Sequence, residues 1–188
     1  MNRSIALVFS LLSLLLTGCA TTTGGKTVGE QRQSILTMKN ETLLKLYKLK
    51  PDVKSQISQA SGYAVFSNAN VNLLIASFGG GYGVVKNNST GKYTYMKMGE
   101  VGVGLGLGAK DFRIVFVFHS KSAMSQFIDK GWAFGGQADV AAKAGEKGAA
   151  VGGEFTVDNM IIYQMTESGL ALQATVKGTK FWKDDKLN

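Results

Sequence analysis

The most specific chemical signal in the sequence is a single cysteine at the end of an apolar N-terminal run. Residues 5–16 are apolar except for two serines, they follow the basic Arg3, and they lead into Leu16-Thr17-Gly18-Cys19. The run is shorter than the ~20 residues of a transmembrane helix, which is typical of a cleaved leader. The Leu-Thr-Gly-Cys spacing resembles the bacterial lipobox, which predicts a signal peptide over residues 1–18 and a diacylglycerol thioether on Cys19. The alternative is an ordinary secretory leader whose thiol carries no lipid.

A lipidated Cys19 would make the protein a membrane-anchored lipoprotein that contacts membrane lipid through this residue. Burying three acyl chains, palmitate among them, at roughly 0.8 kcal/mol per CH₂ makes such an attachment effectively permanent. The residue after the cysteine is Ala20, whereas lipoproteins retained in the inner membrane favour Asp at this position. We therefore expect the protein to be located at the periplasmic face of the bacterial outer membrane. Residues 19–29 are interpreted as the lipidated cysteine and a small, polar tether, followed by a single domain over residues 30–188.

Other kinds of site chemistry are limited by the composition. With one Cys and one His, the chain can form neither a disulfide framework nor a Cys/His zinc site. A Ser-His-acid triad would depend on His119 alone, at the end of a predicted strand. Asp184 and Asp185 are adjacent, but they lie in a charged C-terminal stretch that we expect to be solvated. The glycine-rich runs match no nucleotide-binding pattern. We therefore expect a protein that is not an enzyme, with no catalytic residue, cofactor or metal.

The charge of the chain favours anionic partners. The net charge is +8, and lysines interleaved with leucines follow the tether. Lys39, Lys45, Lys48, Lys50 and Lys54 are the candidate contacts for anionic lipid headgroups, since a lysine near an anionic membrane contributes about 1 kcal/mol. The alternative is that these lysines form the solvated face of a helix packed on the core. Nucleic acid is not an expected partner, because the chain shows no motif that binds it.

Hydrophobic periodicity divides the domain into helices and strands. Steps of three and four residues predict helices over Glu30–Lys50, from Asp52 to about Ala60, and over Ser120–Lys130, with Gly131 at the last one's stop position. A period of two predicts the strands. They are expected at Tyr63–Ser67, Leu73–Phe78, Gly81–Val85, Tyr93–Met98, Val101–Ala109, Phe112–His119, Phe134–Lys143, Ala150–Val157, Met160–Thr166 and Leu170–Lys177. The order favours an α+β fold, with N-terminal helices followed by a glycine-rich, mostly antiparallel β-sheet or flattened barrel that contains one inserted helix.

Two predicted strands indicate what their faces contact. Over Phe112–His119 both alternating sets of residues are largely apolar, so this strand is expected to be central and covered on both faces. Over residues 101–108 glycine alternates with Val or Leu, which leaves a bare face at Gly102, Gly104 and Gly106. Something must approach that face closely. One interpretation is that a neighbouring backbone or a packed helix lies against these glycines. The alternative is that the glycine face lines a groove for a lipid chain or a flat partner.

The order of several motifs resembles the SYLF domain family. Residues 59–66 are similar to its opening signature, 79–83 and 99–108 to its glycine-rich segments, 112–128 to its apolar strand and following helix, and 134–141 and 168–170 to later elements. The resemblance covers about residues 40–182. Eukaryotic SYLF domains bind phosphoinositide membranes and actin filaments, and bacterial relatives are commonly envelope lipoproteins. The chain departs from the family pattern at Ser67, Asn87-Asn88 and Gln137.

The resemblance implies a non-enzymatic lipid-binding domain, without its actin partner, which a periplasmic protein does not meet. We therefore expect a lipoprotein whose domain engages anionic lipid or lipid-like ligands at the bacterial envelope. The alternative is a structural envelope protein that binds a protein or peptidoglycan partner and uses lipid only as its anchor. Salt-sensitive vesicle binding that weakens when the lysines of residues 39–54 are changed would distinguish the two.

Overall fold

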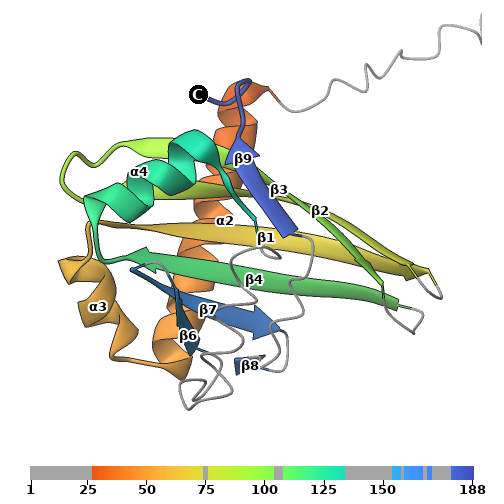
Figure 1. Cartoon of the computed structure of the whole chain (residues 1–188), viewed down its shortest axis with the longest axis horizontal. Coiled ribbons are helices and arrows are strands. Elements are labelled where there is room, and N and C mark those ends of the chain that lie inside the picture. The colour runs from red at the N-terminus through yellow and green to blue at the C-terminus, as the bar shows by residue number, and fades with distance from the viewer. Residues whose placement is uncertain are drawn as a thin grey trace, which may run out of the picture.

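One antiparallel sheet with helices on both faces forms the part of the chain that the structure describes (Figure 1). The computed structural model describes residues 27–73, 76–103, 108–133, 154–157, 159–166, 169–170 and 179–188. Within these ranges, side chains are described for residues 27–68, 80–99, 112–133, 156, 159–165 and 179–188. The arrangement confirms the predicted α+β class, with N-terminal helices before the sheet and one helix inserted into it.

The sheet is built from nine antiparallel strands. Their bounds are β1 Gly62–Leu73, β2 Ala76–Asn87, β3 Tyr93–Val103, β4 Gly108–Phe118, β5 Trp132–Ala133, β6 Glu154–Val157, β7 Met160–Thr166, β8 Gly169–Leu170 and β9 Thr179–Lys183. The strand order is β5-β9-β3-β2-β1-β4-β7-β6, with β8 paired to β7. The C-terminal strand β9 thus lies between β5 and β3, far from its neighbours in the sequence.

Three helices are fixed by local signals at their ends. The longest, α2 (Val28–Leu49), begins with a capping box in which the Thr27 hydroxyl accepts from the Glu30 N–H, and the Glu30 carboxylate accepts from the Thr27 N–H. The second, α3 (Val53–Gln59), follows Pro51 after a short turn. The third, α4 (Lys121–Lys130), has Ser120 as its N-cap, and it stops where Gly131 adopts a φ of 71°. The three predicted helices are confirmed.

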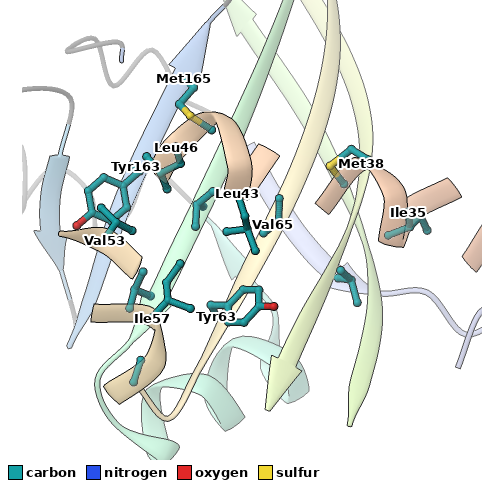
Figure 2. Close-up of a cluster of buried hydrophobic side chains, with 14 of the residues drawn as sticks. Ile35, Met38, Leu43, Leu46, Val53, Ile57, Tyr63, Val65, Tyr163 and Met165 are labelled. Atoms are coloured by element: carbon teal, nitrogen blue, oxygen red, sulfur yellow. The ribbon is translucent and has the colours of Figure 1, made fainter. Parts of the chain in front are cut away.

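The two faces of the sheet carry different cores. On one face, which we call the phenyl face, six phenylalanines pack with Trp132 and several methionines beneath α4. The phenylalanines are Phe66, Phe112, Phe116, Phe118, Phe127 and Phe181. On the other face, which we call the tyrosine face, α2 and α3 pack Ile35, Met38, Leu43, Leu46, Val53 and Ile57 against Tyr63, Val65, Tyr95, Tyr163 and Met165 of the strands (Figure 2). Strand β4 contributes to both cores, which confirms that it is central.

The structure corrects two predicted strands. Leu73–Phe78 spans the end of β1 and the start of β2, because Leu73 pairs with Ala76 across a tight reversal. Val101–Ala109 likewise spans the end of β3 and the start of β4. Apolar and small residues continue through both segments without a Pro or Asn to mark the reversal, so the hydrophobic period could not reveal it. Phe134–Lys143 lies outside the described residues, as do residues 171–178.

The C-terminal stretch is also more structured than expected. Asp184, predicted to be solvated, is 6% exposed, because β9 pairs with β3 and brings this carboxylate to 3.2 Å from the Lys97 ammonium. Leu187 is buried on the tyrosine face beneath α2. Asp185 is exposed, as predicted. The last ten residues therefore belong to the folded domain.

Candidate functional site

The five candidate lysines occupy three kinds of environment. Lys39 is 7% exposed; its ammonium donates to the Tyr93 hydroxyl at 3.3 Å and lies 5.2 Å from the centre of that ring. Lys50 pairs with Asp52 at 2.8 Å, and this hydrogen bond lowers the pKa of the Asp52 carboxyl. Lys45, Lys48 and Lys54 are exposed. Helix α2, which carries Lys39, Lys45 and Lys48, docks on the sheet, so Lys39 is buried against the core. Lys45 and Lys48 face outward from α2, and Lys54 faces outward from α3. Their contact with lipid remains a prediction.

An apolar and cationic strip runs along the outer side of α2. Leu44 and Leu49 are 61% and 45% exposed, and they flank Lys45 and Lys48. Residues three and four positions apart lie on one side of a helix, so these four side chains form a continuous patch. We call this patch the α2 strip. The periodicity of the sequence places its leucines among the apolar residues, but it could not show that they remain uncovered.

A second exposed patch lies on the tyrosine face of the sheet beside α2. Tyr82 of β2, Lys97 of β3 and Trp182 of β9 are aligned directly opposite one another across three adjacent strands. Tyr82 is 45% exposed and Trp182 is 39% exposed. The row continues through Ser67 to Arg113. We call Tyr82, Lys97 and Trp182, together with the adjoining Gly80, Gly99 and Lys180, the ledge.

The ledge could not be predicted from the sequence. Its three central residues come from three strands whose pairing joins position 82 to 97 and 97 to 182. Gly80 lies two residues before Tyr82 and therefore on the same face, but a glycine in a run of three gives no sign of an exposed patch.

Several polar groups on the tyrosine face have partners within the protein. The Tyr163 hydroxyl donates to the Gln56 side-chain oxygen at 2.6 Å, and the Arg32 guanidinium lies 5.6 Å from the centre of the Tyr95 ring. Burial raises the pKa of Tyr47, Tyr63 and Tyr95 above the ordinary tyrosine value. These phenols therefore stay neutral at physiological pH and serve the core, whereas the ledge and the α2 strip are exposed.

A groove of about 480 Å³ opens where α2, α4 and the C-terminus meet. Three of its charged residues, Arg32, Asp129 and Lys183, already have partners within the protein. Lys183 pairs with Asp129 at 3.4 Å, and the Arg32 Nε donates to the Leu187 carbonyl at 3.0 Å. This groove therefore offers less charge to a ligand than its lining suggests.

The remaining candidate residues can be placed only in part. Cys19, Gly104 and Gly106 lie outside the described residues, while the backbone of Gly102 pairs with Ser77 in the sheet. His119 is exposed just after β4. Within the described ranges, no cluster of three or more His, Cys, Asp or Glu could hold a metal ion. None of the helices described is long and apolar enough to cross a membrane.

Comparison with known proteins identifies the family. Residues 99–188 match a family described as Ysc84, "Las17-binding protein actin regulator". Beta cell expansion factor A of Aeromonas veronii is 36% identical over 162 residues, which cover 86% of this chain and 60% of that relative. The chain thus spans about 60% of the length of this curated relative. SYLF domains are binding domains associated with lipids and proteins. The resemblance to the Ysc84 (SYLF) family seen in the motifs is confirmed by both comparisons.

Proposed function

We propose that this protein is a lipid-anchored envelope lipoprotein whose domain binds anionic membrane lipid through the side of the sheet that carries α2. The distribution of exposed apolar side chains supports this function. Among the described residues, the five large hydrophobic side chains left exposed all lie on α2 or on the ledge. They are Val28, Leu44, Leu49, Tyr82 and Trp182. Exposed apolar groups gathered on one side of a molecule mark an interaction surface.

The chemistry of the α2 strip suits a membrane interface. Burying a fully exposed leucine contributes roughly 2 kcal/mol, so two half-exposed leucines together contribute about that amount. Lys45 and Lys48 would add about 1 kcal/mol each near anionic lipid. The sum of about 4 kcal/mol corresponds to a dissociation constant of about 1 mM. Such weak binding requires a means of holding the domain close to the bilayer.

The proposed lipid anchor would supply that proximity. The expected tether between Cys19 and the Thr27 cap of α2 is residues 20–26. A flexible chain of that length would span roughly 15 Å and keep the domain at the membrane surface. Short tethers give effective concentrations in the millimolar range. Binding with a dissociation constant of about 1 mM would then be substantially occupied. An acylated Cys19 and a weak lipid-binding surface therefore complement each other.

Vesicle flotation of residues 20–188, which contain every described helix and strand, tests the lipid-binding function. We expect binding to phosphatidylglycerol vesicles that is lost with phosphatidylcholine alone and weakened at high salt. The variant Lys45→Gln/Lys48→Gln should reduce partition about 25-fold at low salt. Lys121→Gln/Lys130→Gln removes the same charge from α4, on the opposite face, and serves as the matched control. Absence of vesicle binding at low salt would favour a protein or peptidoglycan partner instead.

Anchoring and location need a separate test. In a bacterial host, the full chain should incorporate labelled palmitate and sediment with outer-membrane fractions. Cys19→Ser should abolish both, because only the thiol can form the thioether. Labelling that persists in Cys19→Ser would contradict the proposed anchor without affecting the lipid-binding surface.

A further inference from the structure

The ledge has the composition of a membrane-interface site. Tyr82 and Trp182 stand on either side of Lys97, and residues directly opposite in antiparallel strands have Cβ atoms about 5 Å apart. Tyrosine and tryptophan are enriched where an apolar region meets water, because each ring has an apolar body and a polar tip. An aromatic–lysine–aromatic row therefore matches the boundary between lipid headgroups and acyl chains.

Glycines make the ledge flat and accessible. Gly80 and Gly99 are paired across β2 and β3, next to the row of Tyr82 and Lys97. No atom lies within 4 Å of the position that a Cβ on Gly80 would occupy, so the floor is open there. At Gly99 that position is 3.0 Å from the Trp182 ring. The indole therefore rests on the bare Gly99 backbone, which fixes its orientation while its outer side stays exposed.

The charge of the ledge is complementary to an anion. Lys180 lies opposite Gly99 and is exposed, and Lys97 is the other ammonium of the patch. Asp184 offsets part of this charge through its ion pair with Lys97. The same lysines on a chain of net charge +8 disfavour a second copy of the chain as the occupant. A flat anionic surface fits the open floor better than a small ligand, which would need a concave pocket.

We propose that the ledge is a second membrane contact, at which Trp182 and Tyr82 enter the headgroup region of an anionic bilayer and Lys180 binds lipid phosphate. This inference rests on the proposed lipid-binding function. It adds the ledge, a surface on the sheet, to the α2 strip as a second site of lipid contact. Both surfaces lie on the side of the sheet that carries α2. The aromatic rings provide affinity that salt does not weaken, and the lysines provide selectivity for anionic lipid.

Tryptophan fluorescence can test this contact, because the chain has only two tryptophans. Trp132→Phe leaves Trp182 as the reporter at the ledge, and it keeps an aromatic ring in the phenyl core. Trp182→Phe leaves the buried Trp132 as the matched control. With phosphatidylglycerol vesicles, the Trp182 emission should shift to shorter wavelength and become less accessible to a water-soluble quencher. The Trp132 emission should not change.

Flotation of the same variants separates the inference from the proposed function. If the protein floats but Trp182 shows no shift, the ledge is not a contact and the lipid-binding function stands. If neither flotation nor a shift occurs, both are wrong. A shift of Trp132 as well would indicate that the core opens on vesicles, which also contradicts a contact limited to the ledge.

Charge and aromatic variants give a second, independent measurement. Lys180→Gln should weaken partition into anionic vesicles about fivefold. Tyr82→Ser should weaken it with little change in salt dependence, because it removes no charge. Lys97 is left intact, since its loss would leave the buried Asp184 without its ion pair. Unchanged partition in both variants would overturn the proposal, provided that their circular dichroism matches that of the parent protein.

Discussion

The two faces of the sheet differ in which aromatic residue they use. Every phenylalanine whose side chain is described lies in the phenyl core, whereas the six tyrosines of the chain lie on the tyrosine face or pack against it. The phenyl rings contact one another at centroid distances from 4.7 to 6.4 Å, in edge-to-face, tilted and stacked geometries. A phenyl ring needs no polar partner, so this core can be sealed completely.

The tyrosine face carries hydroxyl groups as well as rings, and two of these hydroxyls bond to residues of the covering helices. Tyr163 reaches Gln56 on α3, and Tyr93 meets Lys39 on α2. Helices α2 and α3 do not cover the full length of the long strands, so Tyr82 remains exposed. The phenyl face is thus a closed core, while the tyrosine face combines a core with the exposed surfaces available for binding.

The largest expected effect is on the phenyl face. Phe116 is fully buried and contacts the rings of Phe66, Phe118, Phe127 and Phe181, together with Trp132. Phe116→Ala should lower the free energy of unfolding by about 3–5 kcal/mol, measured by urea denaturation. A loss below about 1 kcal/mol would show that this core is loosely packed. It would also remove the basis for calling this face a closed core.

A somewhat smaller loss of unfolding free energy is expected when a buried residue of α2 is truncated. Leu46 of α2 is fully buried on the tyrosine face, and Leu46→Ala should cost about 3 kcal/mol. Hydrogen exchange should show that the amides of α2 open before those of β4. Uniform exchange across the chain would mean that the two faces unfold as one unit, which would weaken the distinction between them.

Two glycines on β2 provide a matched pair with opposite surroundings. A Cβ on Gly83 would overlap the Phe66 ring and the Val65 carbonyl oxygen, whereas one on Gly80 would meet open space. Gly83→Ala should therefore cost about 1–3 kcal/mol through overpacking. Gly80→Ala should be neutral or stabilising by up to about 1 kcal/mol. Thermal unfolding measures both, and equal losses would contradict an open ledge floor.

The smallest effect concerns alkaline pH. Burial raises the pKa of Tyr63 above that of an unfolded tyrosine, and the same holds for Tyr47 and Tyr95. Their contribution to stability is complete below a pH of about 10 and is lost as the pH rises beyond it, because the unfolded chain ionises first. Tyr63→Phe should make this alkaline loss shallower in denaturation curves recorded between pH 8 and 11. An unchanged pH dependence would show that Tyr63 does not titrate with unfolding.

Much of the local structure could be predicted because its signals lie within a few residues. The helix bounds follow from caps and apolar spacing, and Met160–Thr166 is the strand that the alternation predicted. The reversal at residues 73–76 could not be predicted, since no turn-forming residue marks it. Asp184 was misjudged for another reason: a charged C-terminal stretch gives no sign that its strand will pair with β3.

The class of the fold, the positions of the three helices, the two-sided burial of β4 and the resemblance to the SYLF family could all be inferred from the amino-acid order. Each of these depends on periodicity, capping or motif order, which are local or collinear properties. That Tyr82, Lys97 and Trp182 form one row, and that Leu44 and Leu49 stay uncovered, became visible only in the folded protein. Strand register and helix docking join residues that are distant in the chain, so the binding surfaces emerge only when the sheet has assembled.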